Sequence, residues 1–283
     1  MARVVVTGGS GKLGDVVVAD LASNGYDVVN VDLVPARTER APFTRADLTD
    51  YGQTIEVLTA IDSRYQGVDA VVHLAAIPGP GAAPNATIFA NNVISTYNVF
   101  AAARAVGVRN VVWASSETLL GLPFDTPPPY IPLDEEYAAR PETAYALSKH
   151  LGEQMAIQMC RQDPTLKIVG LRFSNVMRPA DYAAFPSYDD NPQLRRWNLW
   201  GYIDARDGAQ AVRKALAYEA TGFETFIIAN ADTVMSRSST SLASEVYPDV
   251  EVRKQLGYHE TMLSIDKARR LLGYEPEHSW RDA

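Results

Sequence analysis

Cysteine, long apolar runs and excess positive charge are all scarce in this chain of 283 residues. The single cysteine, Cys160, excludes an intramolecular disulfide and fits a reducing compartment. No uninterrupted apolar stretch reaches the roughly 18 residues of a membrane-spanning helix, and the apolar run within residues 1–7 is too short for a secretion signal. The net charge of −8 argues against a nucleic-acid or membrane partner. We therefore expect a cytoplasmic protein.

What the chain has instead is an alternation of short β-branched runs with amphipathic segments, which is typical of a parallel α/β sheet. The expected strands are 3–7, 27–32, 70–73, 110–114, 167–173 and 225–229. The expected helices lie near 13–23, 51–61, 84–106, 141–162 and 204–219. Valine and isoleucine dominate the strands, as in sheets covered on both faces. The pattern predicts a doubly wound, Rossmann-type α/β fold.

Three long segments interrupt this alternation, at residues 78–84, 121–140 and 177–201. They are rich in proline or aromatic residues and show little regular pattern. Loops of this length inside a domain are usually functional or mobile. Each follows a predicted strand or precedes a predicted helix at the edge where open α/β sheets bind ligands.

A glycine-rich turn joins the first predicted strand to the first predicted helix. Its spacing is G-x-x-G-x-x-G, with Gly8, Gly11 and Gly14 around Lys12 and Leu13. Glycines permit a tight turn and a close approach of backbone to pyrophosphate, and the helix N-terminus offers amides to the phosphates. Because strand, turn and helix follow in the required order, the turn predicts a dinucleotide site.

Acidic residues after the second and third predicted strands suggest which dinucleotide binds. Asp32 ends the second strand, where a carboxylate accepts hydrogen bonds from ribose hydroxyls and repels a 2′-phosphate. This favours NAD, while Arg37 in the following loop keeps NADP open. Asp47, with Leu48, either covers the adenine or caps the next helix.

Tyr145 and Lys149 form the pair that points to chemistry. Four residues apart on a helix, their side chains share one face. An ammonium beside a phenol favours the phenolate, which lowers the tyrosine pKa from its usual value of about 10. We expect this pair to act as a general base on an alcohol.

These motifs, in order, resemble the extended short-chain dehydrogenase/reductase family, in its NAD-dependent epimerase/dehydratase group. The glycine turn, Asp47-Leu48, His73 through Ala76, Tyr145 with Lys149, and residues 171–175 all take part. Residues 91–98, 115–116, 202–207 and 267–274 continue the match over nearly the whole chain. The resemblance implies a hydride-transferring enzyme that holds NAD.

The resemblance also implies roles for individual residues. Ser116 would bind the substrate oxygen, Tyr145 would be the acid/base, and Lys149 would hold the nicotinamide ribose. The other implied cofactor contacts are Leu74, Ala75, Ala76, Asn91, Ser115 and Ser174. Plainer interpretations stay open: His73 as a satisfied core histidine, Asn91 as a helix cap, and the serines as ordinary strand ends.

Two departures from the family pattern concern the substrate. Leu120 replaces a frequent tyrosine, and Glu117 directly follows the proposed catalytic serine, so it either contacts substrate or is a surface acid. The connection after Asn175 is short and carries Arg195 and Arg196. This layout resembles the uronate dehydrogenase branch, in which an arginine would hold a carboxylate bidentately. The alternative is a solvated basic loop with a packed tryptophan.

The sequence therefore predicts an NAD-dependent oxidoreductase acting on a small sugar or sugar acid, with no metal. A sugar-nucleotide epimerase/dehydratase and an inactive dinucleotide sensor are the alternatives. Residues 1–175 would bind NAD, and 176–283 would form a substrate lobe from which 202–230 returns to the sheet. The resemblance further suggests a homodimer paired through the helices at 84–106 and 141–162.

Overall fold

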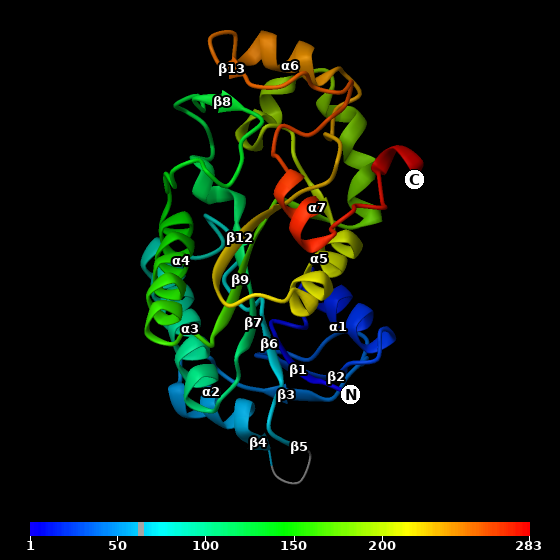
Figure 1. Ribbon diagram of the computed structural model, residues 1–283. Helices are drawn as coiled ribbons and strands as arrows, with labels where there is room; N and C mark the ends of the chain where they lie inside the picture. The colour runs from blue at the N-terminus through cyan, green and yellow to red at the C-terminus, as the bar shows by residue number, and fades with distance from the viewer. Residues whose placement is uncertain (62–64) are drawn as a thin grey trace.

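A seven-stranded parallel sheet lies at the centre of the computed structural model, which describes residues 1–61 and 65–283 (Figure 1). The strand order is β12-β9-β7-β6-β1-β2-β3. Between β1 and β6 the winding direction reverses, which is where open α/β sheets bind ligands. The strands are β1 (Arg3–Thr7), β2 (Asp27–Asp32), β3 (Phe43–Arg45), β6 (Ala70–His73), β7 (Asn110–Ser116), β9 (Lys167–Phe173) and β12 (Gly222–Ile228).

Helices cover both faces of this sheet. On one face α1 (Gly14–Ser23) packs beside α5 (Ala205–Ala217). On the other lie α2 (Tyr51–Thr59), α3 (Asn85–Ala105) and α4 (Ala144–Gln162), as Figure 1 shows. The two apolar cores alternate along each strand, with Val4 and Val6 facing one core and Val5 the other. This burial on both faces explains the unbroken valine runs.

The predicted elements agree closely with the structure, and the deviations have local causes. β7 continues to Ser116, so both serines belong to the strand. α4 begins at Ala144 rather than 141 because the Thr143 hydroxyl accepts a hydrogen bond from the Ala146 amide, at 3.0 Å, and caps the helix. β12 runs from 222 to 228, three residues earlier at its start than predicted.

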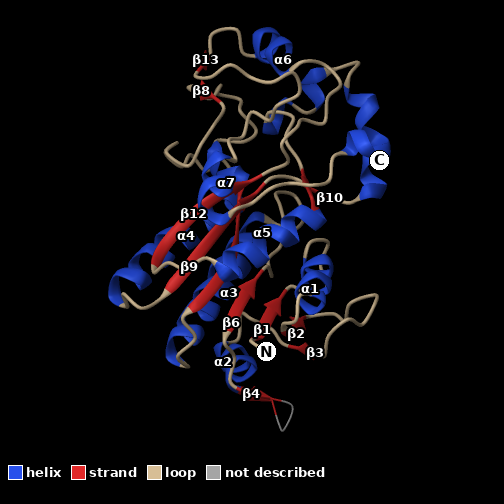
Figure 2. Ribbon diagram, turned by 45° about the vertical axis from the view of Figure 1, so that its right-hand side comes forward, coloured by secondary structure: helices blue, strands red, loops and turns tan. Residues whose placement is uncertain are grey.

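A smaller lobe lies beyond the carboxyl edge of the sheet (Figure 2). It contains two small parallel pairs, β8 (Tyr130–Ile131) with β13 (Glu251–Val252) and β10 (Val176–Met177) with β11 (Ile203–Asp204). Segment 121–140 thus reaches this lobe through β8. The segment 177–201 is more regular than predicted, since it forms three 3-10 helices. These are η2 (Pro179–Tyr188), η3 (Pro192–Leu194) and η4 (Arg196–Asn198).

The remaining elements of the chain lie partly in this lobe and beside the sheet, whereas the pair β4 and β5 lies at the opposite end of the molecule (Figure 1). They are η1 (Glu117–Leu120), α6 (Ser239–Val246), α7 (Asp266–Leu272), η5 (Trp280–Asp282) and the antiparallel pair β4 (Ala60–Ile61) and β5 (Tyr65–Gln66). In the described part of the chain, every helix lacks either the length or the apolar character needed to cross a bilayer.

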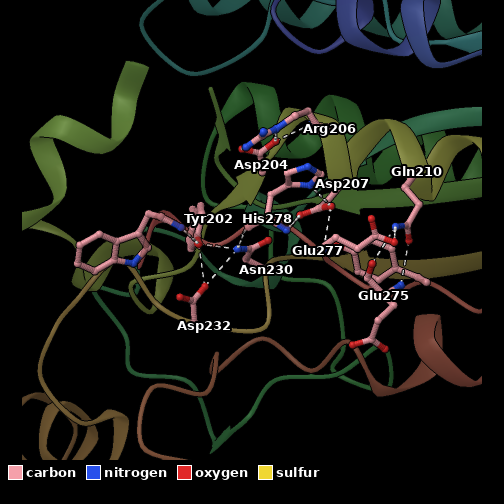
Figure 3. A network of polar contacts seen from close by, with 12 residues as sticks. Tyr202, Asp204, Arg206, Asp207, Gln210, Asn230, Asp232, Glu275, Glu277 and His278 are labelled. Atoms are coloured by element: carbon pink, nitrogen blue, oxygen red, sulfur yellow. Dashed lines mark hydrogen bonds and ion pairs between the residues drawn. The ribbon is translucent and has the colours of Figure 1, made fainter. Parts of the chain in front are cut away.

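A buried polar network fastens the C-terminal segment to the sheet and the lobe (Figure 3). The Asp207 carboxylate at the start of α5 accepts hydrogen bonds from the amides of Glu277 and His278, both at 3.0 Å. Nearby, the Asn230 side chain donates to the His278 carbonyl at 2.8 Å, and Tyr202 donates to Asp232 at 2.7 Å. The network holds the start of α5 and the loop after β12 together, directly behind the carboxyl edge.

Candidate active site

A cleft of about 730 Å³ opens at the carboxyl edge of the sheet, around the point where the winding reverses. Nearly all of the residues predicted for the site line it, although they come from eight separate stretches of the chain. They are Gly8, Gly11, Lys12, Leu13, Gly14, Asp32, Asp47, Leu48, Leu74, Ala75, Ala76, Asn91, Ser115, Ser116, Glu117, Tyr145, Lys149, Ser174 and Asn175. Arg195 and Arg196 are not among the lining residues.

The glycine turn forms one end of the cleft, and its geometry requires glycine. Gly8 has φ +70°, and a Cβ there would lie 2.6 Å from the Ala75 amide nitrogen. A Cβ on Gly14 would overlap the Gly8 carbonyl oxygen. No side chain caps the N-terminus of α1. A narrow backbone cradle that ends in an uncapped helix fits a pyrophosphate.

Asp32 lies beside this turn, at the end of β2. Its carboxylate accepts hydrogen bonds from the Leu33 amide at 2.7 Å and the Ser10 amide at 3.1 Å. Ser10, which sequence reasoning missed, also accepts from Asn30 at 3.1 Å and lines the cleft. Its position inside the glycine turn was the available signal. The acceptor-rich end of β2 fits ribose hydroxyls.

Ser116, Tyr145 and Lys149 meet at the opposite end of the cleft, where β7 and α4 lie against each other. The Lys149 ammonium nitrogen donates to the Ala114 carbonyl at 2.7 Å and lies 5.7 Å from the centre of the Tyr145 ring. The Ser116 oxygen accepts from the Thr118 amide at 3.2 Å. A strand end and a helix face thus bring the three groups together.

The sequence predicts that Lys149 lowers the pKa of Tyr145 below its usual value of about 10, and in this structure that prediction is wrong. Burial raises the pKa of Tyr145 to about 12; the nearby Ser116 hydroxyl opposes this rise, and the Glu117 charge adds to it. Burial also lowers the pKa of Lys149 to about 7, so its charge is itself weakened near neutral pH. Desolvation outweighs the pair attraction because both groups are enclosed.

The structure decides the plainer interpretations of His73 and Asn91. His73 is a satisfied core residue, since its ring nitrogens lie 2.7 Å from the Thr7 hydroxyl and 3.4 Å from that of Thr96, and burial lowers its pKa to about 3. Asn91 is no helix cap, because it lies in the second turn of α3 and donates to Asn92 at 3.0 Å.

Asp47 does not cap α2 either. It accepts from the Thr49 amide at 2.9 Å in a local turn, whereas Asp50 accepts from the Gln53 amide at 3.0 Å and so caps the helix. The helix begins at residue 51, as predicted, so the residue directly before it, Asp50, is the cap. Asp47 lines the cleft nonetheless.

Beyond Ser116, a cluster of buried polar side chains closes the cleft. Glu117 is 3% exposed, and its Oε1 accepts a hydrogen bond from the side-chain amide of Asn198 at 3.2 Å. Burial raises the pKa of Glu117 to about 7, although the Ser174 hydroxyl, Asn198 and the Arg195 charge each work against that rise. Glu117 is therefore no surface acid, and its protonation state changes near neutral pH.

The two predicted arginines occupy different places. Arg195 is 6% exposed, and its guanidinium donates to the Asn175 side chain at 3.1 Å and to the Gly201 carbonyl at 2.9 Å. It is sandwiched between the rings of Tyr188 and Trp197, at 5.5 and 4.9 Å from their centres. Arg195 thus supports the cleft wall from behind.

Arg196 lies at the surface. Its guanidinium is 3.7 Å from the carboxylate of Asp125, whose side chain is 84% exposed. In contrast to Arg195, it has the character of the solvated basic loop considered above.

A buried ion pair that sequence reasoning missed supports the serine strand. Glu153 binds Arg172 through two hydrogen bonds of 2.9 and 2.8 Å, and Ser115 donates to the same carboxylate at 2.7 Å. Glu153 lies four residues after Lys149, so the helical spacing was the signal that could have revealed it. The pair holds β7, β9 and α4 in register beneath the proposed catalytic groups.

Comparison with known proteins agrees with this geometry. Residues 4–229 match the model of the NAD dependent epimerase/dehydratase family. The chain belongs to this family. Its predicted membership, its Rossmann-type fold and its NAD dependence are thereby confirmed, and it is an enzyme of the short-chain dehydrogenase/reductase type.

Curated relatives fall into two kinds of enzyme. The NAD-dependent glucose-6-phosphate dehydrogenase of Haloferax volcanii is 30% identical, over 66% of this chain and 76% of that protein. The L-arabinose 1-dehydrogenase (NAD(P)+) of the same organism is 28% identical, over 76% and 83%. A putative UDP-glucose 4-epimerase of Methanocaldococcus jannaschii is 29% identical over 61% of this chain, but the match spans only 55% of that relative.

Solved structures give the same fold over the full length. A UDP-galactose 4-epimerase superposes with a TM-score of 0.71 at 26% identity, covering 98% of this chain and 94% of the other. A mutated uronate dehydrogenase superposes at 0.69 and 21% identity, covering 99% and 84%. The latter likeness concerns the fold alone.

Replacement of Gly8 by alanine should disable the phosphate end of the cleft. The new Cβ meets the Ala75 backbone at 2.6 Å and must adopt a left-handed φ, so the turn shifts. We expect at least a tenfold rise in the Kd for NAD, about 1.4 kcal/mol, measured by isothermal titration calorimetry. Gly257→Ala, whose Cβ would meet only ordinary contacts at 3.5 Å, is the control. Equal NAD affinity in both variants would contradict the cradle.

Stability should depend on the proton of Glu117. Its folded pKa of about 7 lies above the usual 4.5, so the group stabilises the fold at low pH and loses this contribution as the pH rises through 7. Relative to Glu117→Gln, the wild type should lose on the order of 2 kcal/mol of unfolding free energy between pH 5 and 8. Urea unfolding across this range measures the difference. Parallel pH profiles for the two proteins would refute it.

Proposed function

We propose that the protein oxidises a small sugar at a carbinol carbon by hydride transfer to NAD. The observation that carries the proposal is one cleft with two ends: the glycine turn at one, and Ser116, Tyr145 and Lys149 at the other. When bound, NAD supplies the hydride acceptor, and the protein supplies position and proton handling. The residues for both tasks lie at strand ends, in the loops that follow them and on the helices packed against the sheet.

Each residue of the triad has a separate task in this proposal. Ser116 hydrogen-bonds the substrate oxygen and fixes its orientation. Tyr145, as its phenolate, would accept the hydroxyl proton while the carbinol carbon gives its hydride to NAD, so the sugar gives up one proton and one hydride. Because burial raises the pKa of Tyr145 to about 12, its own proton must leave before this step. Lys149, anchored on the Ala114 carbonyl, holds a ribose hydroxyl and brings positive charge toward the phenol.

The cofactor end supports NAD in particular. Gly11, Lys12, Leu13 and Gly14 would surround the pyrophosphate, and Asp32 would bind the adenosine ribose. The further contacts that we propose are Asp47, Leu48, Leu74, Ala75, Ala76, Asn91, Ser115 and Ser174. NADP is disfavoured because its 2′-phosphate would face the Asp32 carboxylate.

A sugar-nucleotide 4-epimerase is the second candidate, favoured by the epimerases among the relatives. In that case NAD stays bound and no NADH accumulates. An inactive dinucleotide sensor is the third, but a sensor has no need of Ser116, Tyr145 and Lys149 together in one cleft.

We further propose a division of labour along the chain. Residues 1–175 would bind NAD, and 176–283 would bind the sugar, apart from 202–230, which returns α5 and β12 to the sheet. The reach of segment 121–140 into the lobe through β8 adds a sugar-side wall from the first part. A single buried free cysteine supports a cytoplasmic location.

A homodimer would bury the outer faces of α3 and α4. These helices form a groove of about 710 Å³ lined by Val93, Tyr97, Leu151 and Met155, among others. Large apolar side chains are exposed nearby, with Tyr97 at 50% and Ile94 at 44%. Contiguous apolar surface of this kind marks an interaction site, and a second copy of the same two helices would match its shape.

The wild type should produce NADH from a free aldose, and Tyr145→Phe should not. Removal of the phenolic oxygen leaves the glycine turn intact, so we expect NAD affinity within twofold of wild type and a fall in kcat of at least a hundredfold. NADH absorbance and calorimetry measure the two quantities. Tyr258→Phe, at a side chain 70% exposed, is the matched control.

Two results would contradict this proposal in different ways. Turnover of a UDP-sugar without net NADH would select the epimerase. Full activity of Tyr145→Phe would remove the acid/base assignment.

The dimer has its own test. Multi-angle light scattering should give twice the mass of the 31.0 kDa chain. Met155→Glu places a charge in the groove between α3 and α4 and should shift the mass to that of a monomer. A monomeric wild type would exclude this interface.

A further inference from the structure

The substrate end of the cleft contains an unusual concentration of unsatisfied polar atoms. Ten buried side-chain nitrogen and oxygen atoms lack a hydrogen-bond partner within the part of the chain that the structure describes. Four of them belong to one cluster: Glu117 Oε2, Ser174 Oγ, Asn198 Oδ1 and Arg195 Nε. Buried polar groups are normally paired. Of these four residues, Glu117 and Ser174 line the cleft, so they are the two that a polar ligand bound there would reach.

The cluster meets the cleft through Glu117, Ser174, Asn175 and Trp197, which all line it. Glu117 and Ser116 both line this part of the cleft, and the Glu117 charge is near enough to Tyr145 to raise its pKa. One of its oxygens accepts a hydrogen bond from the Asn198 side chain at 3.2 Å, while the other makes no hydrogen bond of ordinary geometry, although the Ser174 hydroxyl lies close enough to oppose the rise in the Glu117 pKa. A carboxyl group in this position is suited to accept a hydrogen bond from a hydroxyl on the substrate.

The positive charge in the cluster is already engaged by neighbouring groups. Arg195 is absent from the cleft lining, and its terminal nitrogens are already bound to Asn175 and the Gly201 carbonyl. It therefore offsets the charge of Glu117 from behind instead of offering a site for a substrate carboxylate. A sugar acid entering the cleft would meet the carboxyl of Glu117, and like charges repel strongly where water is excluded.

We propose that Glu117 determines substrate specificity by accepting a hydrogen bond from a sugar hydroxyl and by excluding sugar acids. The favoured substrate is then a neutral aldose. This inference rests on the proposed dehydrogenase function and narrows its substrate class, from a small sugar or sugar acid to the uncharged sugar.

Matched pairs of substrates test the inference, because they differ in one carboxylate alone. NADH formation is measured with glucose against glucuronate and galactose against galacturonate, above the pKa of Glu117, which is about 7. The wild type should have a kcat/KM at least tenfold higher for each aldose. Glu117→Gln keeps the size of the side chain and removes its charge, so this ratio should fall at least fivefold, through a lower KM for the uronate.

Two further variants separate specificity from structure. Glu117→Asp retains a carboxyl group and should retain the exclusion of uronates. Asp125→Asn removes an exposed carboxylate outside the cleft lining and should leave the ratio unchanged. If Glu117 had a merely structural role, its substitution would lower kcat/KM for the aldose and the uronate alike. The ratio of the two kcat/KM values would then keep its wild-type value in every variant.

Each outcome bears on one claim. A wild type that prefers uronates, or a ratio that Glu117→Gln does not move, would overturn the role of Glu117 while the dehydrogenase function stands. An absence of NADH with all four sugars would instead refute the dehydrogenase function. Circular dichroism of Glu117→Gln and Glu117→Asp shows whether each variant is folded. A loss of fold is thereby distinguished from a loss of specificity.

Discussion

Burial of ionisable side chains at the carboxyl edge of the sheet is the constraint on which the site depends. Tyr145, Lys149 and Glu117 are all enclosed. Desolvation raises the pKa of Tyr145 and Glu117 and lowers that of Lys149, so that it favours the uncharged form of each. Burial therefore weakens the charges of these three groups, although Lys12, Asp32 and Asp47 line the cofactor side of the same cleft. In such an environment, any positive charge brought near Tyr145 has a large effect on its acidity, because little solvent screens it.

The fold holds these groups in place through contacts remote from the chemistry. The ion pair of Glu153 with Arg172 fixes α4 against β9 and also holds Ser115. The cap at Thr143 sets where α4 begins, and hence which face carries Tyr145. At the other end of the cleft, the absence of a Cβ on Gly8 allows the turn to contact the backbone after β6. Position is thus secured by the sheet and helices.

Much of this arrangement could be predicted from the sequence because it follows local rules. Valine-rich runs buried on both faces gave the strands, and glycine spacing gave the phosphate turn. Other features could not be predicted, because they depend on contacts between distant segments. Arg195 lies outside the cleft lining, and its guanidinium donates to the Asn175 side chain and the Gly201 carbonyl. The pKa of Tyr145 rises because enclosure outweighs the neighbouring lysine, and enclosure is a property of the whole fold.

Hydride transfer from the sugar to NAD is the central claim, and an isotope label follows the hydride directly. An aldose carrying deuterium on its reacting carbon, incubated with the protein and NAD, should yield NADH that is one mass unit heavier by mass spectrometry. Free NADH without the label would show that the hydride comes from elsewhere. Label returned to the sugar, with no NADH released, would contradict the account and identify an epimerase.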